Sequence, residues 1–247
     1  MRMIGWRHLL LVAIPVAVLA GFFWAGPIAQ PPEYHLFADR RAWLGVPNVA
    51  NVVSNAAFLL SGALGLCLRR RPDGALYAWL IFFGGVALVG AGSAYYHRAP
   101  ANGPLVWDRL PMTLAFMGLY VAVLAEHVDR RLEKYLLTPA ALIGPASVVY
   151  WGMTGDLRFY LALQVATFAS LVAVVAMFEH AHRQKGFLLA AFALYMVAII
   201  CERLDHPIFS MSAGVVSGHT MKHLFAAGAA VCIVLMLWRR PPLARGA

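Results

Sequence analysis

The chain has 247 residues, of which 62% are hydrophobic and only 13% are charged. Soluble domains carry about twice that charged fraction, so the composition excludes an ordinary soluble domain. The formal net charge of +9 would suit a nucleic-acid-binding protein, but the distribution of the basic residues, described below, argues against that class. The apolar residues form long runs rather than amphipathic stripes, which indicates a polytopic membrane protein.

The apolar runs predict eight membrane spans, each close to the roughly 20 residues that a helix needs to cross about 30 Å of hydrocarbon. In chain order they cover residues 8–25, 49–68, 76–97, 110–127, 136–152, 159–178, 187–204 and 218–238. The connections between them are short. The sequence therefore predicts an all-α fold, a polytopic membrane helical bundle with one N-terminal transmembrane helix (residues 1–30) in front of a seven-helix domain (residues 31–247).

The first span has a second interpretation. Arg2 and Arg7, followed by an apolar stretch that ends near Ala29, also have the order of a cleavable signal peptide. The stretch is long for a signal and lacks a clean small-x-small exit. We therefore expect a retained helix or signal anchor, and under either interpretation the following segment faces the outside.

Two features between the first and fourth spans predict packing rather than chemistry. The loop over about 26–48 is rich in Pro, aromatic and charged residues but too apolar for a disordered linker, so we expect it to cover the outer mouth of the bundle. The third span contains Gly84, Gly85, Gly90 and Gly92. Small residues of this kind let membrane helices approach one another closely.

Basic residues divide unequally between the two sides of the membrane that alternating spans define. One side holds thirteen of them: Arg2, Arg7, Arg69, Arg70, Arg71, Arg130, Arg131, Lys134, Arg183, Lys185, Arg239, Arg240 and Arg245. The other side holds seven: Arg40, Arg41, Arg98, Arg109, Arg158, Arg203 and Lys222. This asymmetry follows the positive-inside rule, so we expect both termini in the cytoplasm and no nucleic-acid partner. The short loops favour a bacterial inner membrane.

Two pairs of residues set four apart lie at the outer ends of the expected spans, Ser93 with His97 and His219 with His223. Residues four apart share one face of a helix, so the His pair is spaced to grip one metal ion. Asp108 is expected at the outer start of the fourth span. Ionisable groups at membrane depth are costly and usually functional. These five residues are therefore the candidate site.

The residue types of this group suit a hydrolytic metal centre. Three histidines and an open fourth position form a catalytic rather than structural zinc site. Bound Zn²⁺ lowers the pKa of water to about 7. Asp108 is then placed to take a proton from that water or to orient a ligand histidine, and Ser93 to donate a hydrogen bond to a developing oxyanion. Glu202, Asp205 and His206 end the seventh span on the same side, and the sequence leaves their roles open.

The same residues carry a resemblance to a known family. GSAYYH (92–97), Asp108 eleven residues later, SGHTMKH (217–223) and NVVSNAAFLL (51–60) resemble the alkaline ceramidase family, within the wider group of membrane hydrolases that includes adiponectin-receptor-like proteins. The resemblance covers about residues 48–238, seven helices. It implies zinc held by His97, His219 and His223, catalytic Ser93 and Asp108, and hydrolysis of the ceramide amide to a sphingoid base and a fatty acid.

One part of the family pattern is missing. Eukaryotic members carry a calcium site built from acidic residues, and the resemblance places the glutamate that starts the first core helix at Asn48. Asp39 is the only acidic residue close before it, and basic Arg40 and Arg41 follow. Fewer carboxylates weaken a site for a hard cation, so the sequence argues against calcium.

Two other functions compete with a zinc-dependent amidase that acts on ceramide or a related N-acyl lipid. A haem or ion-transport protein would need histidines at mid-membrane depth or a charged relay, and the sequence has neither. A seven-helix receptor-like or regulatory protein with a structural zinc site stays open, because a bound metal does not prove turnover. The sequence gives neither the acyl-chain preference nor the oligomeric state.

Overall fold

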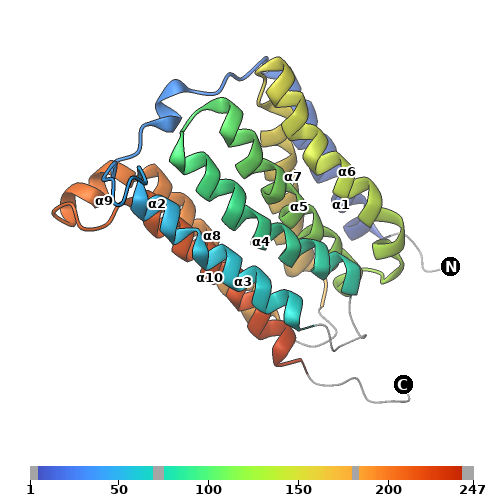
Figure 1. The fold of residues 1–247 in the computed structure, drawn as a ribbon. Helices are drawn as coiled ribbons and strands as arrows, with labels where there is room; N and C mark the ends of the chain where they lie inside the picture. The colour runs from blue at the N-terminus through green and yellow to red at the C-terminus, as the bar shows by residue number, and fades with distance from the viewer. Residues whose placement is uncertain (1–4, 69–74, 180–183, 241–247) are drawn as a thin grey trace. The chain divides into compact units, whose positions relative to one another are not determined.

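The structure is a computed structural model that describes residues 5–68, 75–179 and 184–240. Of the basic residues in the topology argument, Arg2, Arg69, Arg70, Arg71, Arg183 and Arg245 lie outside these ranges. Figure 1 shows that the described residues form helices and connecting loops, with two isolated β-bridges. The helices are α1 (Trp6–Trp24), η1 (Pro32–His35), α2 (Val49–Ser54), α3 (Ala56–Cys67), α4 (Leu76–Arg98), α5 (Asn102–His127), α6 (Arg131–Thr154), α7 (Arg158–Met177), α8 (Lys185–Arg203), α9 (Asp205–Met211) and α10 (Gly218–Trp238). The predicted all-α fold is confirmed.

Eight segments of the described residues are long and apolar enough to cross a membrane, with α2 and α3 together making one of them, Val49–Cys67. The protein is therefore an integral membrane protein. The predicted start of the fourth span at residue 110 is wrong, because α5 begins at Asn102. On a hydropathy scale the charged pair Asp108 and Arg109 marks the end of the apolar run, yet both residues belong to α5 and are buried. Asp108 thus lies in the second turn of α5 rather than ahead of it.

The second span is not one continuous helix, because it is interrupted at Asn55. The backbone N–H of Asn55 bonds to the carbonyl of Val52 at 3.3 Å, one residue short of the α-helical partner, Asn51. Ser and Asn side chains compete with helical hydrogen bonds in this way. The Asn51 carbonyl is consequently left to side chains, and it accepts from the Ser54 hydroxyl at 3.0 Å and the Asn55 amide at 2.7 Å.

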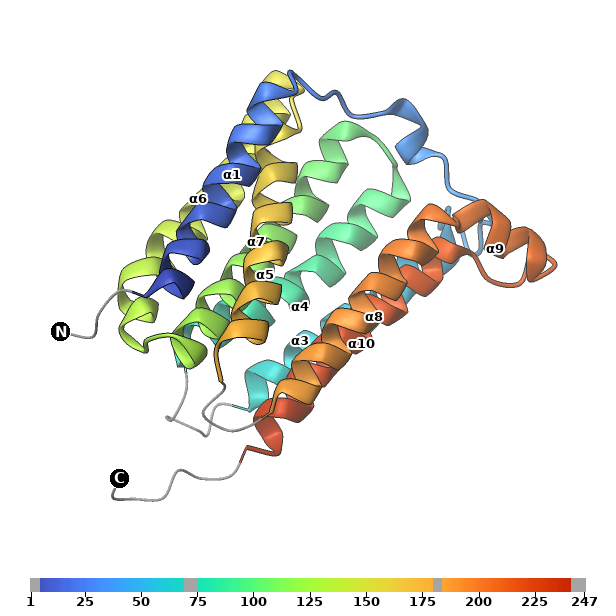
Figure 2. The same cartoon turned by 180° about the vertical axis from the view of Figure 1, so that it is seen from behind.

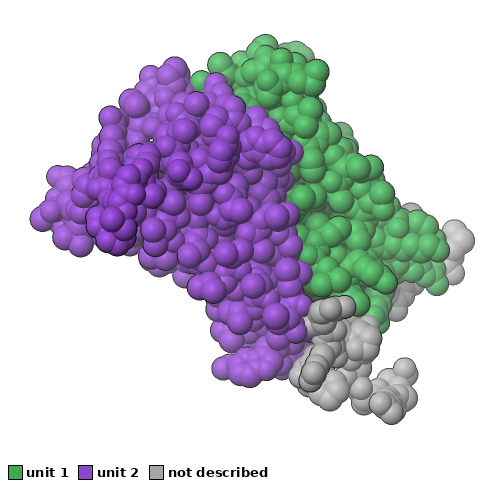
Figure 3. Space-filling model, viewed as in Figure 1, with its two compact units in different colours: residues 1–30, 72–82, 113–183 green, residues 31–71, 83–112, 184–247 purple. Residues whose placement is uncertain are grey.

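The described residues fall into two compact units, which Figure 3 colours separately. Unit 1 comprises residues 1–30, 72–82 and 113–183, and unit 2 comprises residues 31–71, 83–112 and 184–247. Helices α4 and α5 each contribute one end to either unit. All five candidate residues, Ser93, His97, Asp108, His219 and His223, belong to unit 2.

In unit 1, α1 runs beside α6 and α7 in both views (Figures 1 and 2). Near its start, Arg7 donates to the carbonyl of Met177 at 3.1 Å. Beyond its end, Asp156 accepts from the backbone N–H of Ile28 at 3.1 Å, and Arg158 donates to the carbonyl of Phe23. Both ends of α1 are thus attached to α7 or to the residues just before it.

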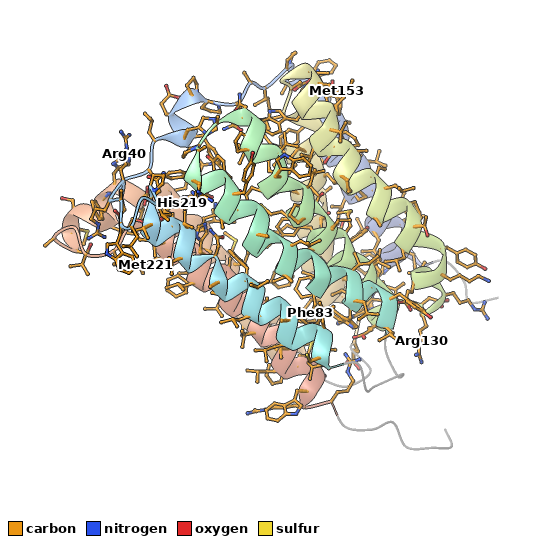
Figure 4. The ribbon with its side chains drawn as sticks, in the orientation of Figure 1. Arg40, Phe83, Arg130, Met153, His219 and Met221 are labelled. Atoms are coloured by element: carbon orange, nitrogen blue, oxygen red, sulfur yellow. The ribbon has the colours of Figure 1, made fainter. Side chains whose placement is uncertain are left out.

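In unit 2, α8 and α10 lie side by side, with α3 along α10 (Figures 1 and 2). Glycine permits a close approach of α3 to the unit 2 part of α4, since a Cβ on Gly62 would lie 2.4 Å from the backbone nitrogen of Ala87. Helices pack this closely only where a side chain is missing. Figure 4 shows His219 at the same end of this unit as Arg40 and away from Phe83.

Candidate active site

Three histidine side chains meet at one end of unit 2. His97 comes from the last turn of α4, and His219 and His223 come from the first two turns of α10. Nε2 of His97 lies 3.2 Å from Nε2 of His219, and one ligand nitrogen from each of the three rings lies within 4.8 Å of the others. All three residues are buried. The structure therefore brings together the histidines that the sequence places at the outer ends of two spans.

The spacing of these nitrogens fits a metal ion. Two nitrogens bound to Zn²⁺ at 2.0–2.1 Å with tetrahedral angles lie about 3.3 Å apart. The 3.2 Å between His97 and His219 agrees with that distance. Neutral imidazole is a ligand for zinc and for several transition metals. The His97–His219–His223 cluster is thus compatible with one divalent ion of that class.

The first turn of α10 is fixed by the residues around its start. Ser217 caps the helix by accepting from the N–H of Thr220 at 3.1 Å, the usual role of serine at this position. Gly218 allows α10 to touch the end of α8, because a Cβ there would lie 2.2 Å from the carbonyl oxygen of Cys201. Asp205 then reaches the N–H of His219 at 2.7 Å. The backbone of this histidine is therefore held from outside its own helix.

The structure shows the contacts of Glu202, Asp205 and His206, whose roles the sequence leaves open. Asp205 is buried and also accepts from the N–H of Ala38 at 2.9 Å. Glu202 forms an ion pair with Lys222 and accepts from the Tyr34 hydroxyl at 3.3 Å. His206 is exposed and bonds the carbonyl of Leu36. Asp205 thus supports the candidate site directly, whereas His206 fastens the loop above it.

The loop that precedes α2 covers the histidine cluster, as the sequence predicts. Phe37 is buried, and its ring centroid lies 4.7 Å from that of His97 and 4.6 Å from that of His219. Beside it, His35 bonds the Tyr96 hydroxyl at 2.9 Å. One side of the cluster is therefore packed against an aromatic ring rather than open to solvent.

Ser93 and Asp108 form the second part of the site. Both are buried, and the Ser93 hydroxyl hydrogen-bonds to the Asp108 carboxylate. Their contact depends on Gly92, where a Cβ would lie 2.1 Å from the carbonyl oxygen of Trp107. The end of α4 and the start of α5 can touch here only because this position lacks a side chain. Ser93 lies one turn before His97 on α4, so the pair lies next to the cluster.

We expect Gly92→Ala to lower the free energy of unfolding by about 1–3 kcal/mol, the usual cost of overpacking a buried contact, and to disturb the Ser93–Asp108 pair. Thermal unfolding of the purified protein measures the loss. Gly84→Ala is the matched control, because a Cβ at Gly84 in the same helix meets nothing within 4 Å. Equal melting temperatures for the two variants would show that the close approach at Gly92 is not required.

Two further residues touch the site; the sequence analysis includes them in the motif at 51–60 but gives them no role. The Ser54 hydroxyl lies 2.7 Å from Nδ1 of His223. Asn51 accepts through its side-chain oxygen from the Thr220 hydroxyl at 2.9 Å, which ties α2 to α10. Asn51, Ser54 and Asn55 are spaced at i, i+3 and i+4 in an apolar run, which places them on one helix face. That polar stripe was the available signal.

The two residues that the sequence analysis considers for calcium, Asp39 and Asn48, bond to other groups of the protein. Asp39 is buried and receives two hydrogen bonds from the Arg41 guanidinium, at 2.8 and 2.6 Å. These bonds hold the pKa of Asp39 below its ordinary value. Asn48 uses its amide to donate to the carbonyl of His97 at 2.8 Å. Both side chains are thus engaged within the protein.

The fold and the site together define an integral membrane protein with a buried three-histidine cluster beside a serine–aspartate pair. The family model described as Ceramidase matches residues 45–242, well over half of the chain, so the chain belongs to the Ceramidase family. The matched range contains all five candidate residues and begins after α1. Membership supports a hydrolase that acts on the amide bond of a ceramide-type lipid. A comparison with curated proteins finds no match.

Proposed function

We propose that this protein is a zinc-dependent intramembrane amidase that hydrolyses ceramide or a related N-acyl lipid to a sphingoid base and a fatty acid. The observation that carries the proposal is the 3.2 Å approach of His97 and His219 beside His223, next to the Ser93–Asp108 pair. Family membership supplies the reaction class. The proximity of these five residues supports giving each of them a role in that reaction.

His97, His219 and His223 are the residues that would hold the metal. Zinc, when bound, supplies Lewis acidity, which polarises a carbonyl and makes water acidic at neutral pH. Three protein ligands leave the fourth coordination position free, as in catalytic zinc sites. The burial of the three rings strengthens electrostatic interactions in the site, because the surroundings have a low dielectric constant.

Asp108 is the proposed proton carrier. Its carboxylate accepts a proton from the attacking water and returns it to the amine that leaves, since an amine departs far more readily when protonated. The Ser93 hydroxyl donates to this carboxylate and so fixes its direction. Protonation removes the negative charge of Asp108, so the carboxyl group accepts a weaker hydrogen bond from Ser93. The Ser93 hydroxyl can then donate to the negative charge that develops on the carbonyl oxygen of the substrate.

We further propose that both termini are cytoplasmic and that the site faces the extracytoplasmic side of a bacterial inner membrane. The support is the excess of basic residues on one side of the alternating spans. A lipid amide lies near the membrane interface, and the candidate residues occupy helix ends, so substrate and site are expected at similar depth. The seven membrane-spanning segments after α1 form the hydrolase domain, and α1 is an additional span.

The decisive experiment is mass-spectrometric detection of the sphingoid base and fatty acid released from a panel of N-acyl lipids by the purified protein. We expect product from ceramide-type lipids, loss of activity after zinc is chelated, and recovery when zinc is restored. Repeating the chelation on spheroplasts with a membrane-impermeant chelator tests the orientation, since only an outward-facing site would be inhibited. Tight zinc binding without product from any lipid would instead favour the receptor-like alternative.

A further inference from the structure

The three histidines differ in how their imidazole rings are supported. Nδ1 of His97 is buried and has no hydrogen-bond partner among the described residues. For His219 the external support is at the backbone, through Asp205. For His223 it is at the ring, because Nδ1 lies 2.7 Å from the Ser54 hydroxyl and the ring also bonds the Asn51 backbone. His223 is therefore the ligand whose ring direction is fixed by neighbours on another helix.

The hydrogen bonds around Ser54 favour one tautomer of His223. The Ser54 hydroxyl donates to the Asn51 carbonyl at 3.0 Å, so its single proton is already used. A carbonyl can only accept. With the Ser54 proton on the Asn51 carbonyl, Nδ1 of His223 is the donor in its contact with Ser54, and the lone pair lies on Nε2, the other ring nitrogen.

The interrupted second span makes this arrangement available. In an uninterrupted α-helix the Asn51 carbonyl would accept from the N–H of Asn55, but that N–H is directed to Val52 instead. The Asn51 carbonyl can then accept from side chains, and it positions the Ser54 hydroxyl against α10. The break between α2 and α3 thus turns a backbone group of one helix toward a side chain of another.

We propose that Ser54, held by the Asn51 carbonyl that the break at Asn55 releases, is a positioning residue that sets the tautomer and ring direction of His223 and so raises the affinity of the site for zinc. The proposal rests on the proposed metal centre and adds a determinant of its strength. Outer hydrogen-bond partners of metal-ligating histidines contribute in this way in other proteins. Ser54 itself touches neither metal nor substrate.

The test is the dissociation constant of zinc for the full-length, detergent-solubilised protein, measured by competition with a chromophoric chelator. Ser54→Ala should weaken zinc binding by about 10- to 100-fold, the usual effect of losing such a partner. Ser54→Thr keeps the hydroxyl and should restore affinity near the wild-type value. Ser61→Ala is the matched control: Ser61 is a buried serine of α3 that donates to the Phe58 carbonyl at 3.1 Å and contacts no ligand.

Thermal unfolding of the metal-free variants separates lost affinity from lost folding. Should Ser54→Ala not fold, Ser54→Cys takes its place, because a thiol offers only a weak acceptor and should give an intermediate affinity. Wild-type affinity in Ser54→Ala, or equal weakening in Ser61→Ala, would overturn the role of Ser54 alone. A wild-type protein that binds no zinc would overturn the metal centre as well, so the two failures are distinguishable.

Discussion

Replacing His219 by alanine is expected to strip tightly bound zinc from the purified protein and to abolish lipid amide cleavage. The substitution removes one of three nitrogens that lie within 4.8 Å of one another, and two imidazoles hold the ion far less tightly than three. The loss of affinity should exceed the roughly 100-fold that removing a mere outer partner can cost. Elemental analysis of the dialysed protein gives the metal content per chain, and the lipid assay gives the turnover.

His8→Ala is the control for this variant. His8 is exposed near the start of α1 in unit 1, and its ring lies against that of Phe178. It should keep both zinc and turnover. Full zinc occupancy in His219→Ala would refute the assignment of this histidine as a ligand.

Replacing Asp108 by asparagine is expected to leave zinc in place and to lower kcat by about 10²- to 10⁴-fold, the usual contribution of a general acid–base group. Asparagine is similar in shape and still accepts a hydrogen bond from Ser93, but it cannot carry a proton. The loss should fall on kcat rather than on KM, because the proton moves only in the transition state. Steady-state kinetics on a lipid that the wild-type protein cleaves, together with metal analysis, measure both quantities.

Asp129→Asn provides the matching control, since Asp129 is exposed in the turn between α5 and α6 and caps the N–H of Arg131 at 2.9 Å. Its turnover should equal that of the wild type. Unchanged kcat in Asp108→Asn would remove the proton-carrying role, whereas loss of zinc would mean that the carboxylate supports a ligand instead.

The sequence predicts the spans from local hydropathy, and it predicts that the three histidines lie at one end of the bundle from the alternation of those spans. Long apolar runs define helices, and a spacing of four puts His219 and His223 on one face. The predicted start of α5 was wrong because hydropathy treats a charged residue such as Asp108 as facing solvent. Hydropathy does not show that Ser93 bonds Asp108 where Gly92 lets the two helices touch. A hydropathy scale therefore places the end of a membrane span at a charged residue, even where that residue is buried beside a hydrogen-bond partner.

The supporting contacts could not be predicted, because they join distant parts of the chain through close helix packing. Asp205 reaches the N–H of His219 only because Gly218 lets α10 touch the end of α8. Ser54 reaches His223 from the break between α2 and α3, where the N–H of Asn55 bonds to the carbonyl of Val52. Serine and asparagine are ordinary in such positions, so only the three-dimensional structure separates a partner of a ligand from a packing residue.

Asp205 joins the covering loop to the histidine cluster, because one carboxylate oxygen accepts from Ala38 and the other from His219. The two segments are therefore mechanically interdependent, and neither can shift far without breaking a bond to the same side chain. Order imposed on the imidazoles by a bound ion would spread into residues beside Phe37, and loosening of the loop would be felt at the ligands. A single acidic group would thus couple the mobility of the loop to the occupancy of the proposed metal site.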